Sequence, residues 1–169
     1  MLAVIGGMMR RFSILLVLAL LFVGCAAIGP VSSPEFPSLV AKTIPKEDGE
    51  IRLFGSGNWY PNVRGFTAIR SILLATPVPP TPGALVITDE ALIFLQWDEE
   101  AKIFDVIKRL PYSELVAVSL DSYGLNRRIV LRKKDLSYDS FDFTQASGNL
   151  VDATKVEQAI EFLLGRIKP

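Results

Sequence analysis

Few side chains in this sequence could carry covalent or acid–base chemistry. Cys25 is the single cysteine, and there is no histidine. Without histidine the chain lacks the usual general base at neutral pH and the commonest metal ligand. One cysteine can form neither an internal disulfide nor a zinc cluster. A leftover cysteine of this kind needs an explanation, and its place in the sequence supplies one.

The carboxylates and hydroxyls do not form a catalytic pattern. Glu99 and Glu100 are adjacent on an expected loop and point in different directions, whereas a glycosidase holds two carboxylates across a pocket. A serine nucleophile has no obvious base without histidine, and the sequence has no Gly-x-Ser-x-Gly elbow, Walker loop or dinucleotide fingerprint. We therefore expect no enzymatic activity, no catalytic residues, no cofactor and no metal.

The N-terminus has the layout of an export signal. Arg10 and Arg11 precede an apolar run from Phe12 to Val23, and the small residues of the block 24–27, Gly-Cys-Ala-Ala, follow it. A short positive region, an apolar stretch of about a dozen residues and small residues at its end are typical of such signals.

The end of the apolar run resembles the lipobox of bacterial lipoproteins. The motif is Leu21-Phe-Val-Gly-Cys25, with Phe22 where the family prefers leucine. The resemblance implies that the sulfur of Cys25 receives a diacylglyceryl group before the signal is removed. Residues 1–24 are then a signal peptide, and residues 25–45 are the lipidated cysteine and its tether. Each buried methylene contributes about 0.8 kcal/mol, so two or three acyl chains leave a bilayer slowly.

The residues around this motif bear on location and on the alternatives. Ala26 and Ala27 follow the cysteine without an aspartate at the second mature position, which in a Gram-negative lipoprotein implies the outer membrane, facing the periplasm. An uncleaved membrane helix is the alternative, because the run 12–28 approaches the ~20 residues needed to span a bilayer. Met8 and Met9 are alternative starts.

The charge balance bears on the class of partner. Lysine and arginine number 18, as do aspartate and glutamate. Removal of residues 1–24 deletes two arginines and no acid, which leaves 16 basic and 18 acidic groups and a net charge of −2. Nucleic-acid binding and electrostatic attachment to anionic lipid both need clustered positive charge. We expect no nucleic-acid partner, and a membrane link through Cys25 alone.

The second half of the chain predicts a run of short strands closed by a helix. Asp89-Glu90 and 98–101 are expected turns, and Phe141-Asp-Phe143 alternates as a strand with one apolar and one wet face. The expected strands are 84–88, 91–97, 103–110, 115–120, 128–132 and 138–143. A helical stripe of apolar residues then follows at Val156, Ala159, Ile160, Leu163, Leu164 and Ile167, with Asp152 or Thr154 as the cap and 154–157 as a capping box.

The segment before these strands is less regular. Residues 34–42 are consistent with a brief helix, and 51–54 alternates like a strand before an expected turn at 55–58. The proline-rich stretch 77–82 is expected to be a stiff crossing that no central strand could tolerate.

This pattern resembles the core of GRAM and other PH-like domains, on residues 83–94 and 110–118. The resemblance implies a mainly β (α+β) fold, an antiparallel barrel or sandwich of about six to seven strands with a C-terminal amphipathic helix. The domain is expected to span 46–169, with a clear core at 83–167. PH-like domains that bind phosphoinositides use basic side chains in a hairpin loop, whereas the hairpins here, 88–90 and 98–100, are acidic.

Four residues form the candidate binding surface. Trp59 and Tyr60 follow a glycine-rich turn and predict either an aromatic ledge for a ligand or a cap on the core. Arg127 and Arg128 belong to the one basic cluster, which predicts either a contact with headgroups or an acidic partner, or a charged hairpin that protects an edge strand.

These patterns together predict a lipid-anchored envelope lipoprotein with a non-catalytic protein-interaction module. The partner would be another envelope protein, bound at the sheet edge or in the groove beside the terminal helix. A periplasmic carrier of a small ligand or lipid is the main alternative, and a divergent hydrolase is the weaker one.

Overall fold

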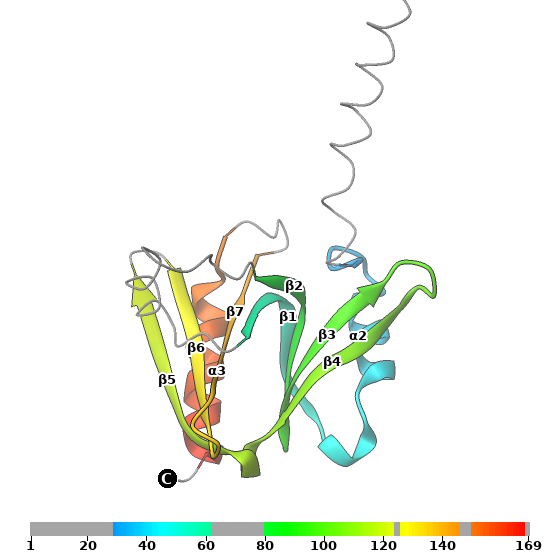
Figure 1. Cartoon of the computed structure of the whole chain (residues 1–169). Helices are drawn as coiled ribbons and strands as arrows, with labels where there is room; N and C mark the ends of the chain where they lie inside the picture. The colour runs from blue at the N-terminus through cyan, green and yellow to red at the C-terminus, as the bar shows by residue number, and fades with distance from the viewer. Residues whose placement is uncertain (1–28, 62–79, 124–125, 146–149, 168–169) are drawn as a thin grey trace, which may run out of the picture.

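A computed structural model describes residues 29–61, 80–123, 126–145 and 150–167 of the chain (Figure 1). They form one seven-stranded antiparallel sheet with two α-helices. The elements are, in chain order, α2 (Phe36–Thr43), η2 (Lys46–Asp48), β1 (Ile51–Pro61), β2 (Thr81–Thr88), β3 (Ala91–Asp98), β4 (Ile103–Pro111), η4 (Tyr112–Glu114), β5 (Leu115–Tyr123), β6 (Asn126–Lys133), β7 (Tyr138–Phe143) and α3 (Ala153–Arg166).

The strand order β4-β3-β2-β1-β7-β6-β5 makes the sheet open. Its two edge strands, β4 and β5, are consecutive in the chain, and they diverge from the short η4 segment between them (Figure 1). A closed barrel needs these edges to pair, so of the two expected forms, barrel or sandwich, the closed barrel is not the one observed. Because β1 pairs with both β2 and β7, the strands form one continuous sheet. The mainly β fold with seven strands and a C-terminal helix is confirmed.

Helix α3 covers one face of the sheet, which we call the inner face. Val156, Ala159 and Leu163 are buried in a core with strand residues such as Phe94 and Phe141. Full burial of a large apolar side chain contributes about 1.5–3 kcal/mol. The whole cluster contains Leu85, Ile87, Leu92, Phe94, Leu110, Tyr112, Leu115, Ile129, Leu131, Phe141, Phe143, Val156, Ala159, Leu163 and Ile167.

The structure selects one of the two expected caps of the terminal helix and changes the predicted apolar stripe at one position. Asp152 is the N-cap, and its carboxylate accepts a hydrogen bond from the Lys155 amide at 3.1 Å. The capping box predicted to begin at Thr154 is therefore wrong, because Thr154 already lies inside the helix. The predicted stripe also includes Leu164, but this side chain is 60% exposed, whereas that of Leu163 is fully buried.

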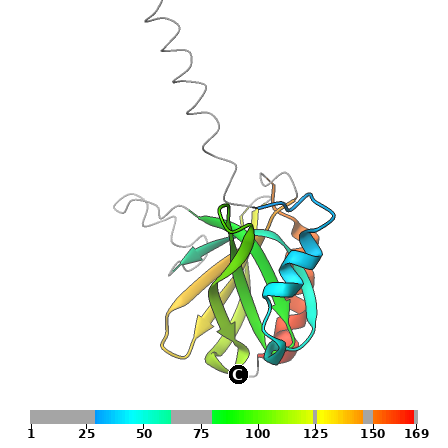
Figure 2. The same ribbon diagram turned by 90° about the vertical axis from the view of Figure 1, so that its right-hand side faces the viewer.

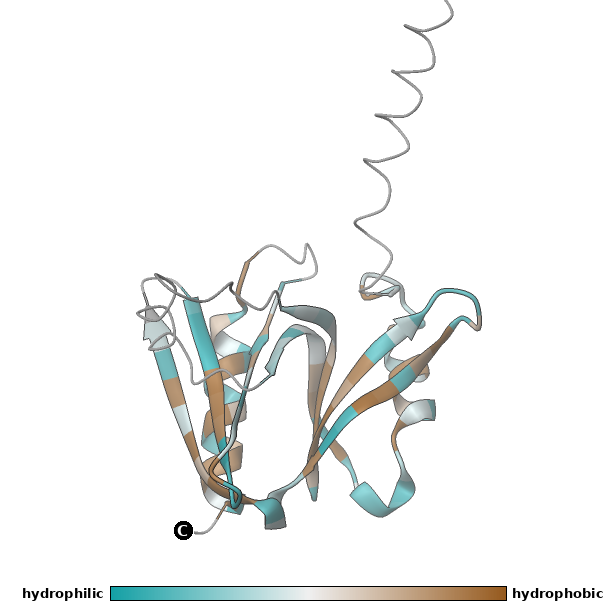
Figure 3. Ribbon diagram, in the orientation of Figure 1, coloured by the Kyte–Doolittle hydropathy of each residue, from teal (hydrophilic) through white to brown (hydrophobic). Residues whose placement is uncertain are grey.

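Helix α2 covers part of the opposite, outer face. Phe36 and Val40 are buried against Val86, Ile93 and Phe104 of strands β2 to β4. Figure 2 shows α2 lying along the outside of these strands. The range 25–45, predicted as a tether, thus contains a helix that belongs to the packed domain. Residues 83–88 of β2 and 91–95 of β3 are buried between the two layers, whereas β4 mixes apolar and polar residues and the β3–β4 hairpin tip is hydrophilic (Figure 3).

The predicted turn at 55–58 is wrong, because these residues lie in the middle of β1. Gly57 pairs with both neighbouring strands, and a Cβ there would stand 2.2 Å from the carbonyl oxygen of Asp142. The glycine therefore serves a close approach of β7 to β1. In the sequence, a glycine that permits two strands to approach closely cannot be distinguished from a glycine of a turn.

The proline-rich stretch also ends differently from expectation. Strand β2 is central, yet it begins at Thr81 and includes Pro82. Pro82 pairs only with β1, because the pairing of β2 with β3 starts at Ala84. Proline has no backbone N–H to donate, and this loss is tolerated at the start of β2 because no β3 residue pairs with Pro82.

Candidate functional site

The two aromatic residues of the predicted surface point to opposite faces of the sheet. They are adjacent on β1, and side chains alternate along a strand. Trp59 lies on the inner face, where its ring centroid is 6.1 Å from that of Phe94. Its indole N–H donates to Asp139 Oδ1 at 2.9 Å. Trp59 thus takes the core-capping place that was one of the two interpretations of the Trp59-Tyr60 pair.

Tyr60 covers a buried carboxylate on the outer face. Its hydroxyl donates to Asp142 Oδ2 at 2.8 Å, and the Arg128 guanidinium lies 3.7 Å from the Tyr60 ring centroid. Asn58 donates its backbone N–H and its side-chain amide to Asp142 Oδ1, at 3.1 and 2.9 Å. Burial raises the pKa of Asp142, and burial followed by the Asp142 charge raises the pKa of Tyr60. The expectation of a wet face is wrong here, because Asp142 is only 2% exposed.

The basic pair and the cysteine complete the predicted set. Arg127 forms an ion pair with Glu157 of α3, whereas Arg128 stacks on Tyr60. The structure therefore unites Tyr60 with Arg128 and separates both from Trp59 and Arg127. Cys25 lies outside the described residues.

A second carboxylate of β7, missed in the sequence, is buried on the inner face. Asp139 is 1% exposed. Its Oδ2 lies 3.1 Å from Lys133 Nζ and 3.7 Å from Lys108 Nζ, while Trp59 donates to Oδ1. Buried carboxylates need such partners. Two ammonium groups face this one carboxylate, so its negative charge is neutralised within the protein.

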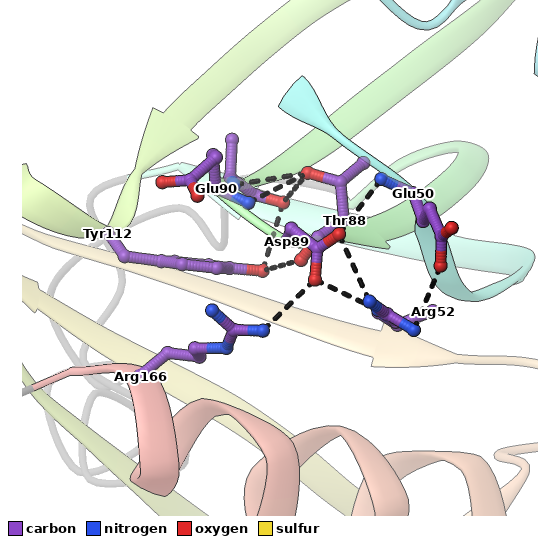
Figure 4. A network of polar contacts seen from close by, with 8 residues as sticks. Glu50, Arg52, Thr88, Asp89, Glu90, Tyr112 and Arg166 are labelled. Atoms are coloured by element: carbon purple, nitrogen blue, oxygen red, sulfur yellow. Dashed lines mark hydrogen bonds and ion pairs between the residues drawn. The ribbon is translucent and has the colours of Figure 1, made fainter. Parts of the chain in front are cut away.

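Two arginines neutralise Asp89 of the predicted acidic hairpin at the β2–β3 turn (Figure 4). The Asp89 carboxylate accepts from Arg52 at 2.9 Å, from Arg166 of α3 at 3.0 Å and from the Glu50 amide at 3.0 Å. The hydrogen bond from Arg52 is the main cause that lowers the pKa of Asp89. Beside it, the Tyr112 hydroxyl donates to the Thr88 carbonyl at 2.8 Å. This network links the turn to both β1 and α3.

An open groove of about 520 Å³ lies beside the start of α3. Its walls come mainly from three elements: the segment leading into α2, the first half of β1 and the first turn of α3. The lining mixes apolar and polar side chains, and consists of Val31, Ser33, Pro34, Phe36, Pro37, Arg52, Leu53, Phe54, Gly55, Ser56, Thr144, Gln145, Asp152 and Lys155. The sequence predicted a groove beside the terminal helix as one of two binding places, but not these residues.

Among the residues that the structure describes, the β1 wall of the groove has a strand neighbour on one side only. Residues 51–59 pair with β2, but the pairing with β7 is confined to 57–61. Beyond it, Thr144 N–H donates to the Ser56 carbonyl at 2.8 Å, and the Lys155 ammonium donates to the Phe54 carbonyl at 3.2 Å. Within the described ranges, Arg52–Gly55 therefore has no strand partner on this side, and we call this stretch the free edge of β1. Such an edge can pair with another extended segment.

The groove lining does not form a catalytic arrangement. Ser56 Oγ donates to the Thr144 carbonyl at 2.9 Å, and the Asp152 carboxylate caps α3. These lining groups are engaged in holding the backbone. Among the described residues, no three or more histidine, cysteine, aspartate or glutamate side chains gather to hold a metal.

None of the helices in the described ranges combines the length and apolar character needed to cross a bilayer. No protein-family model matches this sequence, and no curated protein matches it. Function must therefore be inferred from the geometry of the groove and from the sequence motifs.

Proposed function

We propose that the chain is a lipid-anchored envelope lipoprotein whose PH-like domain is a non-catalytic protein-interaction module. The apolar run that ends in Gly24-Cys25 supports the anchor, and Ala26-Ala27 supports a place at the outer membrane, facing the periplasm. The seven-stranded sheet with a C-terminal helix supports the PH-like assignment.

The observation that carries the interaction role is the free edge of β1 in the groove. A partner segment that enters the groove meets Arg52–Gly55, which has no strand partner on this side among the described residues, and apolar walls from Phe36 and Pro37. Backbone pairing supplies affinity in such strand addition, and the pockets beside the strand supply specificity. The partner is therefore an envelope protein with an extended segment.

Site-specific photo-crosslinking in living cells tests this role. We expect a crosslinking amino acid at exposed positions 37 or 145, both in the groove, to give one adduct of discrete mass. The same amino acid at Glu100, exposed on the β3–β4 turn, is the matched control and should give none. Equal labelling from all three positions, or no adduct from the groove, would contradict the proposal.

The membrane anchor is tested independently. Radioactive palmitate should label the unmutated chain and leave Cys25→Ser unlabelled. An unmutated chain without label, or with its leading apolar stretch still attached by intact mass, would refute the anchor while leaving the groove untouched.

A carrier function is the second candidate, and the volume and apolar part of the groove favour it. A protein purified from detergent-solubilised envelopes with one stoichiometric lipid and no protein partner would support the carrier. Against it, the space between α3 and the sheet is filled by the buried inner core.

A further inference from the structure

Lys155 is a cation held at the free edge of β1. It projects from the first turn of α3, is half-buried, and its ammonium donates to the Phe54 carbonyl at 3.2 Å. The ammonium lies so close over Gly55 that a Cβ there would stand 2.8 Å from Nζ. Within the described ranges, the ion pairs do not include Lys155, so no carboxylate of these residues balances its charge.

The carbonyl that Lys155 occupies is one that an added strand would use. Ser56 and Phe54 are two residues apart, so their carbonyls point to the same side of β1. The first accepts from Thr144 where β7 runs out, and the second is the next acceptor along that edge. The Lys155 ammonium therefore stands where the N–H of a further strand would bind.

The other charged groups of the groove are engaged elsewhere. Arg52 pairs with Asp89 and Glu50, and the Asp152 carboxylate accepts from the α3 backbone. An ammonium has three N–H donors, and the structure shows Lys155 giving one of them to a neutral acceptor. A ligand that displaces the Lys155 ammonium from the Phe54 carbonyl can therefore bind its positive charge.

We propose that the groove binds an extended peptide segment of an envelope protein that carries an acidic side chain. A backbone N–H of the segment donates to the Phe54 carbonyl and displaces the Lys155 ammonium. The carboxylate of the segment then binds the displaced ammonium. Charge-assisted hydrogen bonds are stronger than neutral ones, so this exchange favours an acid over its amide. This inference rests on the proposed interaction role, and it adds the chemistry of the partner.

A matched pair of synthetic peptides tests the inference on the full chain in detergent. The blocked, fluorescein-labelled peptide Thr-Val-Glu-Val-Thr is compared with Thr-Val-Gln-Val-Thr by fluorescence polarisation. We expect the glutamate peptide to bind roughly fivefold more tightly than the glutamine peptide. Hydrogen exchange followed by mass spectrometry should show that it protects the amides of 52–56.

Variants at position 155 assign the preference to its source. Lys155→Met keeps the length of the side chain and removes the charge, so both peptides should bind it with equal affinity. Lys155→Arg keeps the charge and should retain a preference for glutamate. Arg127→Met is the matched control, because Arg127 also carries a positive charge beside α3 but pairs with Glu157 and does not line the groove. This control should leave the preference unchanged.

The outcomes separate the two proposals. Equal binding of both peptides to the unmutated chain, with protection of 52–56, would overturn the acid preference and leave strand addition standing. A preference that survives in Lys155→Met would overturn the role of Lys155. Failure of both peptides to protect 52–56 would overturn strand addition at β1, whatever the crosslinking shows.

Discussion

The two halves of the outer face of the sheet are covered in different ways. Over β2 to β4, helix α2 places Phe36 and Val40 on apolar strand residues. Over β1, β6 and β7, Tyr60 and Arg128 cover the carboxylate of Asp142. One half therefore excludes water with a helix, and the other with its own long polar side chains.

The two halves differ in the free-energy cost of burying their side chains. Apolar burial under α2 is favourable in itself. A buried carboxylate is unfavourable unless hydrogen bonds replace water, and Asp142 has three such donors from Asn58 and Tyr60. Its raised pKa shows that these bonds do not fully offset burial of the charge.

The largest loss of stability is expected in the core of the inner face, which extends beneath both halves of the sheet. Phe94→Ala removes a fully buried ring that contacts Trp59 and Phe141 on the inner face. We expect the free energy of unfolding in urea to fall by about 3–5 kcal/mol. Leu164→Ala, at a site that is 60% exposed, is the control and should change it by less than about 0.5 kcal/mol. A similar loss in the two variants would show that the inner core is not the main source of stability.

A smaller and more local effect is expected under α2. Val40→Ala removes two methyl groups from a fully buried position, which should cost about 1–3 kcal/mol. Hydrogen exchange should increase in α2 before it increases in β6 and β7. Uniform acceleration over the whole sheet would contradict the separate covering of the two halves.

In the polar half, the stability of the fold should depend on pH, whereas in the apolar half it depends on the volume of the buried side chains. Because the pKa of Asp142 is raised in the folded state, the folded chain binds this proton more readily than the unfolded chain does. Its contribution is full below the ordinary aspartate pKa and is lost as pH rises through the raised value. Asp142→Asn should remove this dependence, with an effect smaller than that of either core truncation. Urea unfolding of both proteins from about pH 3 to pH 7 measures it, and parallel curves would contradict it.

The smallest effect, and one of opposite sign, is expected at the β2–β3 turn. The pKa of Asp89 is lowered, chiefly by Arg52, so its contribution is present above the ordinary aspartate pKa and is lost as pH falls through the lower folded-state value. Asp89→Asn should reduce stability at neutral pH and flatten this acid limb. High salt should weaken the effect in the unmutated chain, because the pair is exposed. An acid limb unchanged in the variant would assign it to other carboxylates.

Sequence patterns predicted the strands from β2 to β7 and the terminal helix, because apolar runs and turn residues there agree with the fold. They failed at 55–58, since the composition of a turn and that of a close strand approach are the same. The groove was not predictable in detail. It exists because β7 stops pairing at Gly57 while α3 begins at Ala153, and neither event has a local signature near Phe54.

The strand order also has a consequence for folding kinetics. Neighbours in the sheet are consecutive in the chain except β1 and β7, the first and last strands. The hairpins can form early from nearby residues, whereas this one pairing must close a long loop and is expected to limit the rate. Gly57 lies in that pairing, and a Cβ there would meet the Asp142 carbonyl of β7. A larger residue at position 57 would therefore obstruct the pairing that joins the first strand to the last.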